Sequence, residues 1–309
     1  MTPVIREIAT GLKFPEGPIA LPDGDVLLVE IARGTLSRVK PDGRVEVVAH
    51  TGGGPNGAAM GPDGKVWVCN NGGFEWIDMG GGRLRPAHQP KDYSGGRIER
   101  VDLATGAVEV VYTHGPNGPL RGPNDLVFDA EGGLWFTDLG KTRARELDYG
   151  AVYYARPDGS SIVEVVQPML TPNGIGLSPD GKRLYVAETR AGRLWAWDIE
   201  GPGKLAKRPF PSPWGGTLMV DMSTYRLFDS LAVDAAGNVC VASLMEGGIT
   251  VVSPQGGEVE FVPMPDVYTT NLCFGGPGLK TAFVTLSTTG KLVAIDWPRA
   301  GTPLNFLNG

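Results

Sequence analysis

The chain has 309 residues, of which 41% are hydrophobic and 20% charged, so it carries enough apolar material for a large core. The formal net charge of −6 provides no basic surface, which argues against nucleic acid and anionic membranes as partners. No stretch approaches the ~20 apolar residues of a membrane span, and the first residues lack the pattern of a signal peptide. We therefore expect a cytoplasmic protein that acts on a small ligand.

One short pattern occurs six times along the chain. Each copy has an apolar strand, a tight turn that is often Asp-Gly, and a second apolar strand, which is typical of a β-hairpin. A shared register of this kind marks an internal repeat. We call the second residue of each copy its head residue. The six head residues are Glu16, Asn56, Asn124, Asn173, Asp229 and Asn271.

Two further strands follow the hairpin in most copies. After the first hairpin, residues 34–40 and 44–50 form such a pair around an Asp-Gly turn. Four antiparallel strands repeated six times, without a helix, predict an all-β fold: a single six-bladed β-propeller domain over residues 1–309. The last copy has only a third strand, at 291–297, so we expect residues 4–10 to supply its fourth strand. Pairing of the N- and C-terminal strands then closes the ring.

Propeller geometry predicts where the head residues lie. The first strand of every blade lines the central channel, so all six head residues should meet at one mouth of it. The second strands return to this face and bring their last polar residues near the same mouth. These are Glu30, Asn70, Asp138, Glu188, Ser243 and Thr285. Long connections at 71–95, 113–123, 139–150 and 211–228 are expected on this face, and functional residues concentrate on such loops. The opposite face has short turns and no obvious site.

The head residues offer oxygen ligands, which hard divalent cations prefer, whereas zinc sites favour His and Cys. Glu16, Asn173 and Asp229, with Asn124 as a fourth, form the predicted metal site. Calcium is the first choice, and a loose oxygen site also admits zinc, magnesium or manganese. Turn capping would explain one such residue, but carboxylates buried near an axis without a partner are costly, which favours a cation. Either explanation serves for Asn56 and Asn271.

Other motifs of catalysis are absent from the sequence. It has only three histidines and no G-x-S-x-G motif, which excludes a hydrolase triad, and no Walker lysine follows the glycine-rich segments. Residues on the long connections could contact a substrate, and Trp214 is a further aromatic candidate there. The predicted substrate-binding set is Asn124, Arg121, Asn56, Trp76 and His114. The three cysteines have no metal spacing and are expected to be buried, reduced thiols.

The repeats resemble the family of senescence marker protein, gluconolactonase and luciferin-regenerating enzyme. The resemblance rests on FPEGPIALPDGDVLLVEI from Phe14, GPNDLVFDAEGGLWFTD from Gly122, TPNGIGLSPDGKRLYVAET from Thr171 and FDSLAVDAAGNVCVAS from Phe228, and it covers nearly the whole chain. It implies a six-bladed propeller with one catalytic divalent metal at the channel mouth. By this resemblance Glu16, Asn173 and Asp229 are metal ligands, Asn124 is a ligand or substrate contact, and Asp229 is also the general base.

The same resemblance implies a metal-dependent hydrolase that opens a lactone, such as a sugar lactone or a related small lactone. Many sugar lactonases have arginine two residues before the Asn of the N-D motif, where this chain has Gly122, with Arg121 one place earlier. Either an unbound oxygen of Asp229 or metal-bound hydroxide would act as the base. Two alternatives stay open: a calcium-dependent phosphotriesterase or fluorophosphatase, and a non-enzymatic ligand-binding propeller. The sequence does not indicate the oligomeric state.

Overall fold

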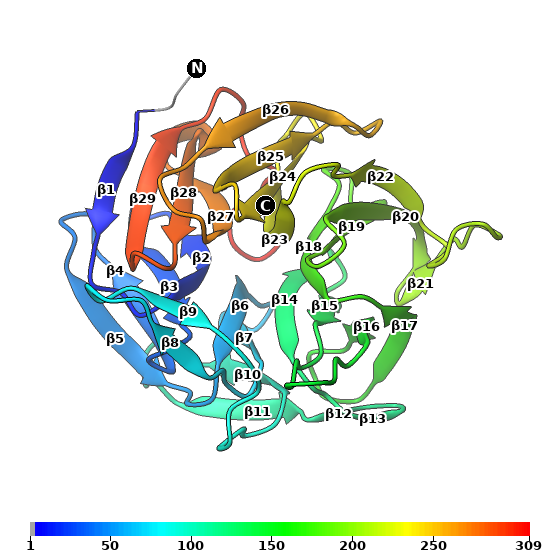
Figure 1. Cartoon of the computed structure of the whole chain (residues 1–309), viewed down its shortest axis with the longest axis horizontal. Helices are drawn as coiled ribbons and strands as arrows, with labels where there is room; N and C mark the ends of the chain where they lie inside the picture. Colours follow the sequence, from blue (N-terminus) through cyan, green and yellow to red (C-terminus); the bar gives the residue numbers. More distant parts are fainter. Residues whose placement is uncertain (1–3) are drawn as a thin grey trace.

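The computed structural model describes residues 4–309 and confirms the six-bladed β-propeller (Figure 1). Six antiparallel sheets surround a central channel, and in five of them the first strand in sequence lies nearest the axis, whereas in the sixth β27 is innermost and β1 is outermost. The one helical segment within residues 4–309 is a 3-10 turn, η1 (Pro277–Leu279). No helix among these residues is long and apolar enough to cross a membrane.

The blades follow one another in chain order. Blade A contains β2 (Pro15–Ala20), β3 (Val26–Glu30), β4 (Thr35–Val39) and β5 (Val45–His50). Blade B contains β6 (Pro55–Met60), β7 (Val66–Asn70), β10 (Arg97–Val101) and β11 (Val108–Tyr112). Blade C contains β14 (Pro123–Phe128), β15 (Leu134–Asp138), β16 (Gly150–Ala155) and β17 (Ile162–Met169).

Blades D to F complete the ring. Blade D contains β18 (Pro172–Leu177), β19 (Arg183–Glu188), β20 (Arg193–Gly201) and β22 (Thr217–Asp221), and β21 (Lys204–Leu205) also pairs with β20. Blade E contains β23 (Leu227–Val233), β24 (Val239–Leu244), β25 (Gly248–Val252) and β26 (Glu258–Pro263). Blade F contains β27 (Thr269–Gly275), β28 (Thr281–Leu286), β29 (Lys291–Asp296) and β1 (Arg6–Ala9).

The predicted closure of the ring is confirmed. Strand β1 pairs antiparallel with β29, with Arg6 opposite Ala294 and Ala9 opposite Leu292. Ala9 and Leu292 are also buried together with apolar residues of blade A. The two ends of the chain therefore share one blade, and that blade packs on the next blade of the ring.

Apolar side chains fill the six interfaces between successive blades. Each interface has its own buried cluster, because the two faces of a blade both pack against neighbours. Trp67 of blade B lies in the B–C interface, and Trp135 and Trp195 lie in the C–D interface. The three cysteines are buried and free, as expected. These contacts hold the first strands in a fixed ring.

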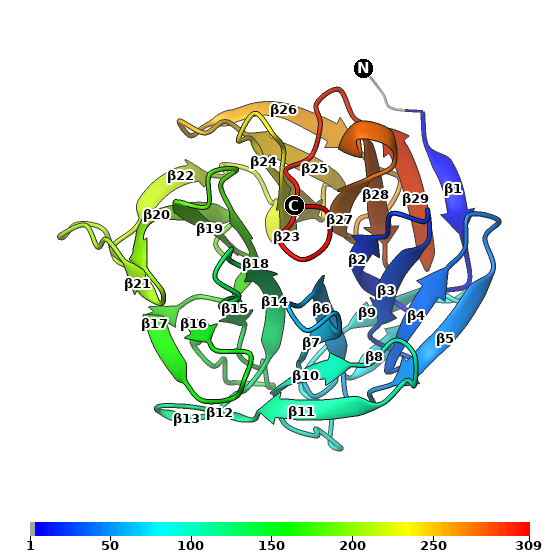
Figure 2. The same cartoon turned by 180° about the vertical axis from the view of Figure 1, so that it is seen from behind.

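The two faces of the ring differ. The loop face carries the head residues and two extra hairpins, β8 (Trp76–Asp78) with β9 (Leu84–Pro86) and β12 (His114–Gly115) with β13 (Gly118–Pro119). The turn face carries the short turns, and the C-terminal segment lies there across the channel (Figure 2). One expectation was wrong. Because β22 is the fourth strand of blade D, residues 206–216 connect the third strand to the fourth from the turn-face side, and Trp214 packs against the C–D interface and not at the mouth.

Close backbone approach fixes the spacing of the innermost strands. The residue after the head is glycine in blades A, B and D, and it touches the next blade. A Cβ atom on Gly17, Gly57 or Gly174 would lie 2.6 Å from the carbonyl oxygen of the next head residue around the ring. A side chain there would push neighbouring head residues apart.

We expect Gly174→Ala to lower the free energy of unfolding by about 1–3 kcal/mol, because the added methyl would meet the Asp229 carbonyl oxygen at 2.6 Å and the Leu231 nitrogen at 2.7 Å. Urea denaturation measures this change. Gly201→Ala is the matched control, since a Cβ there meets no atom within 4 Å. Equal stability of the two variants would show that the inner strands can separate without cost.

Candidate functional site

The head residues meet at the loop-face end of the channel, because the first strands of successive blades contact one another all the way around the ring. Two side-chain hydrogen bonds join heads of adjacent blades. The Asn271 amide donates to Glu16 Oε2 over 2.7 Å, and the Asn173 amide donates to Asp229 Oδ1 over 2.5 Å. Each carboxylate is therefore held by an amide of the neighbouring blade.

Two amide oxygens at this mouth lack partners. Asn124 Oδ1 and Asn173 Oδ1 are buried and accept no hydrogen bond from residues 4–309. The nitrogen of the Asn173 side chain is already used by Asp229 and by the Thr189 hydroxyl, which fixes the rotation of the amide. A buried acceptor without a donor costs free energy, so these oxygens are suited to a cation.

The carboxylates of the site have unusual acidities. Burial raises the pKa of Glu16 well above its ordinary value, and the nearby charge of Asp229 raises it further. Burial likewise raises the pKa of Asp229 to about 8, against the opposing effect of its hydrogen bond from Asn173. Burial also raises the pKa of Asp125 to about 7. Without a cation, these groups hold protons that exposed carboxyls would release.

The donor set at the mouth consists of oxygens, which hard cations prefer. Among residues 4–309, no group of three or more His, Cys, Asp and Glu side chains is arranged to hold a metal. The set at the mouth instead combines two carboxylates, Glu16 and Asp229, with the unpartnered oxygens of Asn124 and Asn173. Mixed carboxylate and amide oxygens suit calcium or magnesium.

The polar residues that end the second strands position the backbone that leads to the heads. Four of the six accept a hydrogen bond from a backbone N–H two or three residues before the head of their own blade. Glu30 accepts from Lys13 at 2.7 Å, Asn70 from Gly54 at 2.9 Å, Asp138 from Arg121 and Gly122 at 2.7 Å, and Glu188 from Leu170 at 3.1 Å. Four blades thus share one device that fixes a head residue.

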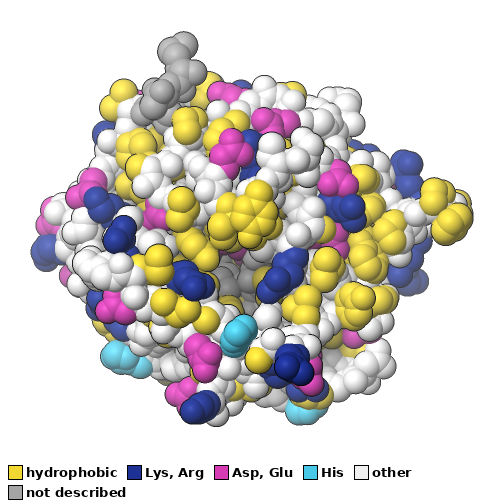
Figure 3. All heavy atoms as spheres, viewed as in Figure 1, with side chains coloured by type: hydrophobic (Ala, Val, Ile, Leu, Met, Phe, Trp, Pro, Cys, Tyr) yellow, Lys and Arg dark blue, Asp and Glu magenta, His cyan; other side chains and the backbone are white. Residues whose placement is uncertain are grey.

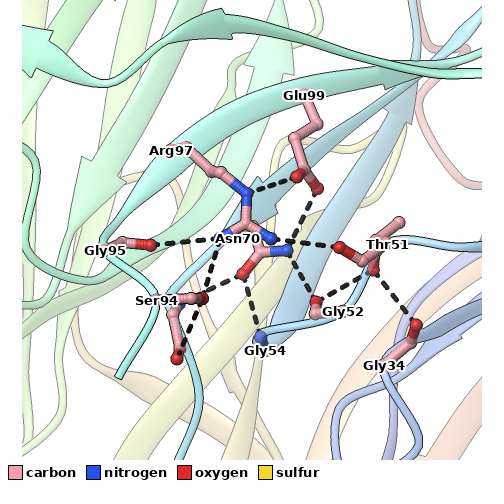
Figure 4. Close-up of polar contacts among 10 residues, drawn as sticks. Gly34, Thr51, Gly52, Gly54, Asn70, Ser94, Gly95, Arg97 and Glu99 are labelled. Atoms are coloured by element: carbon pink, nitrogen blue, oxygen red, sulfur yellow. Dashed lines mark hydrogen bonds and ion pairs between the residues drawn. The ribbon is translucent and has the colours of Figure 1, made fainter. Parts of the chain in front are cut away.

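Figure 4 shows this device in blade B. The Asn70 side chain accepts from Gly54 and donates to the Gly52 carbonyl and to Glu99. Glu99 is itself paired with Arg97. The amide can therefore neither turn toward the mouth nor serve a ligand. Its role is to hold the segment that ends at Asn56.

The backbone is strained where it enters two heads. Phe14, two residues before Glu16, has φ of 57°, and Thr171, two residues before Asn173, has φ of 50°. Side chains with a Cβ rarely adopt this left-handed region, and such strain persists where the surroundings enforce it. The strain occurs directly before two of the residues predicted as metal ligands.

Three of the four remaining candidates for substrate binding lie on the loop face near the mouth, and the fourth does not. Asn56 belongs to the ring of heads, and Trp76 packs its ring against Phe14 with centroids 5.0 Å apart. Arg121 has an exposed side chain at the loop face, and its carbonyl accepts from the Tyr93 hydroxyl. His114 lies in the β12–β13 hairpin beside β17, the outermost strand of blade C, so the structure does not bring it to the mouth.

Sequence reasoning missed two buried charged groups. Asp125 follows Asn124 at a position where the other copies have Gly, Ser or Leu, so it is the one charged residue there, and this difference was a usable signal. Lys141 had no such signal. Its Nζ donates to the Gly73 carbonyl at 2.6 Å and lies 4.2 Å from the Phe74 ring centre, which ties loop 71–95 to blade C. Burial lowers the pKa of Lys141 to about 7.

The channel is open in different ways at its two ends. On the loop face, Figure 3 shows a hollow near the centre, with basic and hydrophobic side chains beside it. A cavity of about 400 Å³ enters from the turn face, lined by apolar residues of the first strands and by 302–305 and 307, and it reaches Asp125 and Asn271 from below. The turn face, where the short turns indicated no obvious site, therefore contains a cavity.

Comparisons with known proteins agree with this architecture. Residues 14–288 match the model of the SMP-30/Gluconolactonase/LRE-like region. The chain is 27% identical to a gluconolactonase of Zymomonas mobilis over 92% of this chain and 79% of that protein. It is 31% identical to lactonase drp35 of Staphylococcus saprophyticus, over 78% of this chain and 67% of that protein.

Solved structures share the fold. A gluconolactonase from Xanthomonas campestris superimposes with a TM-score of 0.74 at 22% identity, covering 95% of this chain and 89% of that one. The calcium-binding protein regucalcin from Agrobacterium tumefaciens gives a TM-score of 0.78 at 19% identity, covering 100% of this chain and 99% of that one. At these identities the likeness supports the fold alone.

We expect the stability of chelator-treated protein to fall as pH rises from about 5 to about 8. The folded pKa of Asp229, about 8, lies above its unfolded value, so the native state binds more protons and the free energy of unfolding decreases through this range. Asp229→Asn should flatten the fall, as urea titrations at several pH values will measure. The exposed control Asp42→Asn should retain the wild-type slope. Parallel slopes for wild type and Asp229→Asn would refute this assignment.

Proposed function

This chain belongs to the SMP-30/Gluconolactonase/LRE-like family, and from that premise we propose that it hydrolyses lactones with the aid of a divalent cation. A sugar lactone such as gluconolactone, or a related small lactone, is the proposed substrate. The observation that carries the proposal is the set of two buried carboxylates and two unpartnered amide oxygens at the channel mouth. The names of the relatives, gluconolactonase and lactonase, support the choice of reaction.

Glu16, Asn124, Asn173 and Asp229 are the residues that would hold the cation. Calcium is our first choice because all four donors are oxygens, and magnesium, manganese and zinc are alternatives. When bound, such a cation supplies Lewis-acid activation of the ester carbonyl and of water. Its positive charge also favours the ionised forms of Glu16 and Asp229, which burial alone disfavours.

Asp229 is the proposed general base. Its Oδ1 accepts the Asn173 amide, whereas Oδ2 has no hydrogen-bond partner among residues 4–309 and is the atom left to take a proton. Water adds to the lactone carbonyl carbon as its proton passes to Oδ2. The ring C–O bond then breaks, and the departing alkoxide oxygen takes up a proton to give a hydroxy acid. The Asn173 hydrogen bond keeps the carboxylate from rotating during this transfer.

We expect purified protein to contain about one equivalent of divalent metal and to release acid from gluconolactone in a pH-stat. Treatment with chelator should remove most of the activity, because the carboxylates at the mouth then favour their protonated forms. Adding calcium back should restore it. Full activity in metal-free protein would contradict the proposed role of the cation. Acid release from a fluorophosphate but not from the lactone would instead support phosphotriester hydrolysis, and no response to either would favour a binding protein.

We expect Asp229→Asn to lower kcat for gluconolactone by about 10²- to 10⁴-fold, because the amide keeps an oxygen for the cation but cannot accept the proton. Metal content and the melting curve should stay near those of the wild type. Asp296→Asn makes the same chemical change at an exposed position in β29 and serves as the control. Near wild-type turnover in Asp229→Asn would remove this residue from the role of base.

A further inference from the structure

One sector of the mouth is aromatic. Phe14 lies two residues before Glu16, and Tyr268 lies three residues before Asn271. The ring of Phe14 is 5.8 Å from that of Tyr268 and 5.0 Å from that of Trp76, centre to centre. These three rings form a wall above blades F and A, on the same side of the ring as Glu16.

Arg85 lies on the hairpin that carries Trp76. Strand β9 pairs with β8, with Arg85 opposite Ile77 and Pro86 opposite Trp76. The backbone N–H of Leu84 also donates to the Thr288 carbonyl over 3.4 Å, which fastens β9 to blade F. The hairpin that carries Arg85 is therefore held over the same sector of the mouth as the aromatic wall.

Arg85 is half-buried, and its side chain has no hydrogen bond, ion pair or aromatic contact with residues 4–309. Every other half-buried arginine in this range has a partner. The paired residues are Arg38, Arg97, Arg100, Arg143, Arg156, Arg183, Arg193 and Arg299. A partly desolvated guanidinium without an anion is costly, since it offers five donors in a geometry suited to carboxylate. The guanidinium of Arg85 is therefore available to bind an anion that is not part of the chain.

The Tyr268 hydroxyl is a second free donor in this sector. Tyr268 is half-buried, and its hydroxyl makes no hydrogen bond within residues 4–309. Burial raises the pKa of Tyr268, the charge of Arg85 lowers it, and the charge of Asp229 raises it. Tyr268 thus lies within electrostatic reach of both the arginine and the proposed base.

Neither Asp266 nor Glu16, the acidic residues next to this wall, forms an ion pair with Arg85. Asp266 accepts from the backbone of Tyr268 and from Thr289, so its oxygens are already used. Glu16 accepts from Gly17 and Asn271. In the proposed reaction, the carboxylate produced by ring opening forms next to the head residues. Arg85, which lies on the hairpin above the wall, would therefore bind a different carboxylate of the substrate.

We propose that Arg85 and Tyr268 form a subsite for a second carboxylate on the substrate, so that the preferred lactones are acidic, of the class formed by sugar diacids. The inference rests on the proposed lactone hydrolysis for its substrate class. The aromatic wall lies against the carbon skeleton, and Arg85 takes the remote carboxylate in a charged hydrogen bond. A neutral sugar lactone leaves the guanidinium unpaired and binds less tightly.

The test compares D-glucaro-1,4-lactone with D-glucono-1,4-lactone, which differ only in a carboxylate in place of a CH₂OH group. We expect wild-type kcat/KM to be higher for the acidic lactone. Arg85→Met should lower the ratio of the two kcat/KM values by about 10- to 100-fold, the usual size of a charged hydrogen bond, and Arg85→Lys should restore part of it. Arg83→Met, which removes an exposed charge from the same hairpin, should leave the ratio at its wild-type value.

Calorimetric binding of D-glucarate and D-gluconate gives a readout that does not require turnover. Tighter binding of glucarate that is lost in Arg85→Met, with neither lactone hydrolysed, would support the subsite and reject the proposed reaction. Hydrolysis of both lactones at equal kcat/KM, or equal loss on both in Arg85→Met, would overturn the subsite and leave the reaction standing. Equal binding of the two acids by wild type, with no hydrolysis, would overturn both.

Discussion

The structure depends on holding two carboxylates, Glu16 and Asp229, largely out of water at the axis of the ring. Burial raises the pKa of both, and each receives an amide hydrogen bond from the neighbouring blade, which only partly offsets the loss of hydration. In an isolated hairpin this arrangement would relax into solvent. It persists here because every head residue belongs to a strand that is packed on both sides, so moving one head requires moving a blade. Perturbed carboxylates in such a setting are typical of functional sites.

The contacts that position the head residues are different from the loops that shape the mouth of the channel. Buried clusters between the blades and the close contacts of Gly17, Gly57 and Gly174 fix the inner strands. The polar residues that end the second strands then fix the backbone leading to the heads. None of these contacts involves the tips of the long connections.

The features that could be predicted from the sequence are those that follow from its six-fold internal repeat. Register alone was enough for six blades, for the closing pair β1–β29 and for the meeting of the heads, because a propeller maps equivalent positions onto equivalent places. Residues on irregular connections could not be placed in this way. His114 was expected near the substrate, yet its hairpin packs on the outermost strand of blade C. Trp214 was assigned to the wrong face because β22 was not recognised as a strand. Contacts such as Lys141 with Gly73 join distant loops and leave no local pattern.

The ring of heads also divides the channel into two compartments of different chemistry. On one side of it, a cavity with apolar and polar lining opens to the turn face and includes residues of the C-terminal segment. On the other side, the loop face presents aromatic rings and unpaired donors, among them Arg85 and Tyr268 of the proposed carboxylate subsite. The buried oxygens of Asn124 and Asn173 and the half-buried guanidinium of Arg85 have no partner among residues 4–309, so they are available to a ligand. The proposed substrate therefore approaches the head residues from the loop face, where these unpaired groups lie beside the predicted cation ligands.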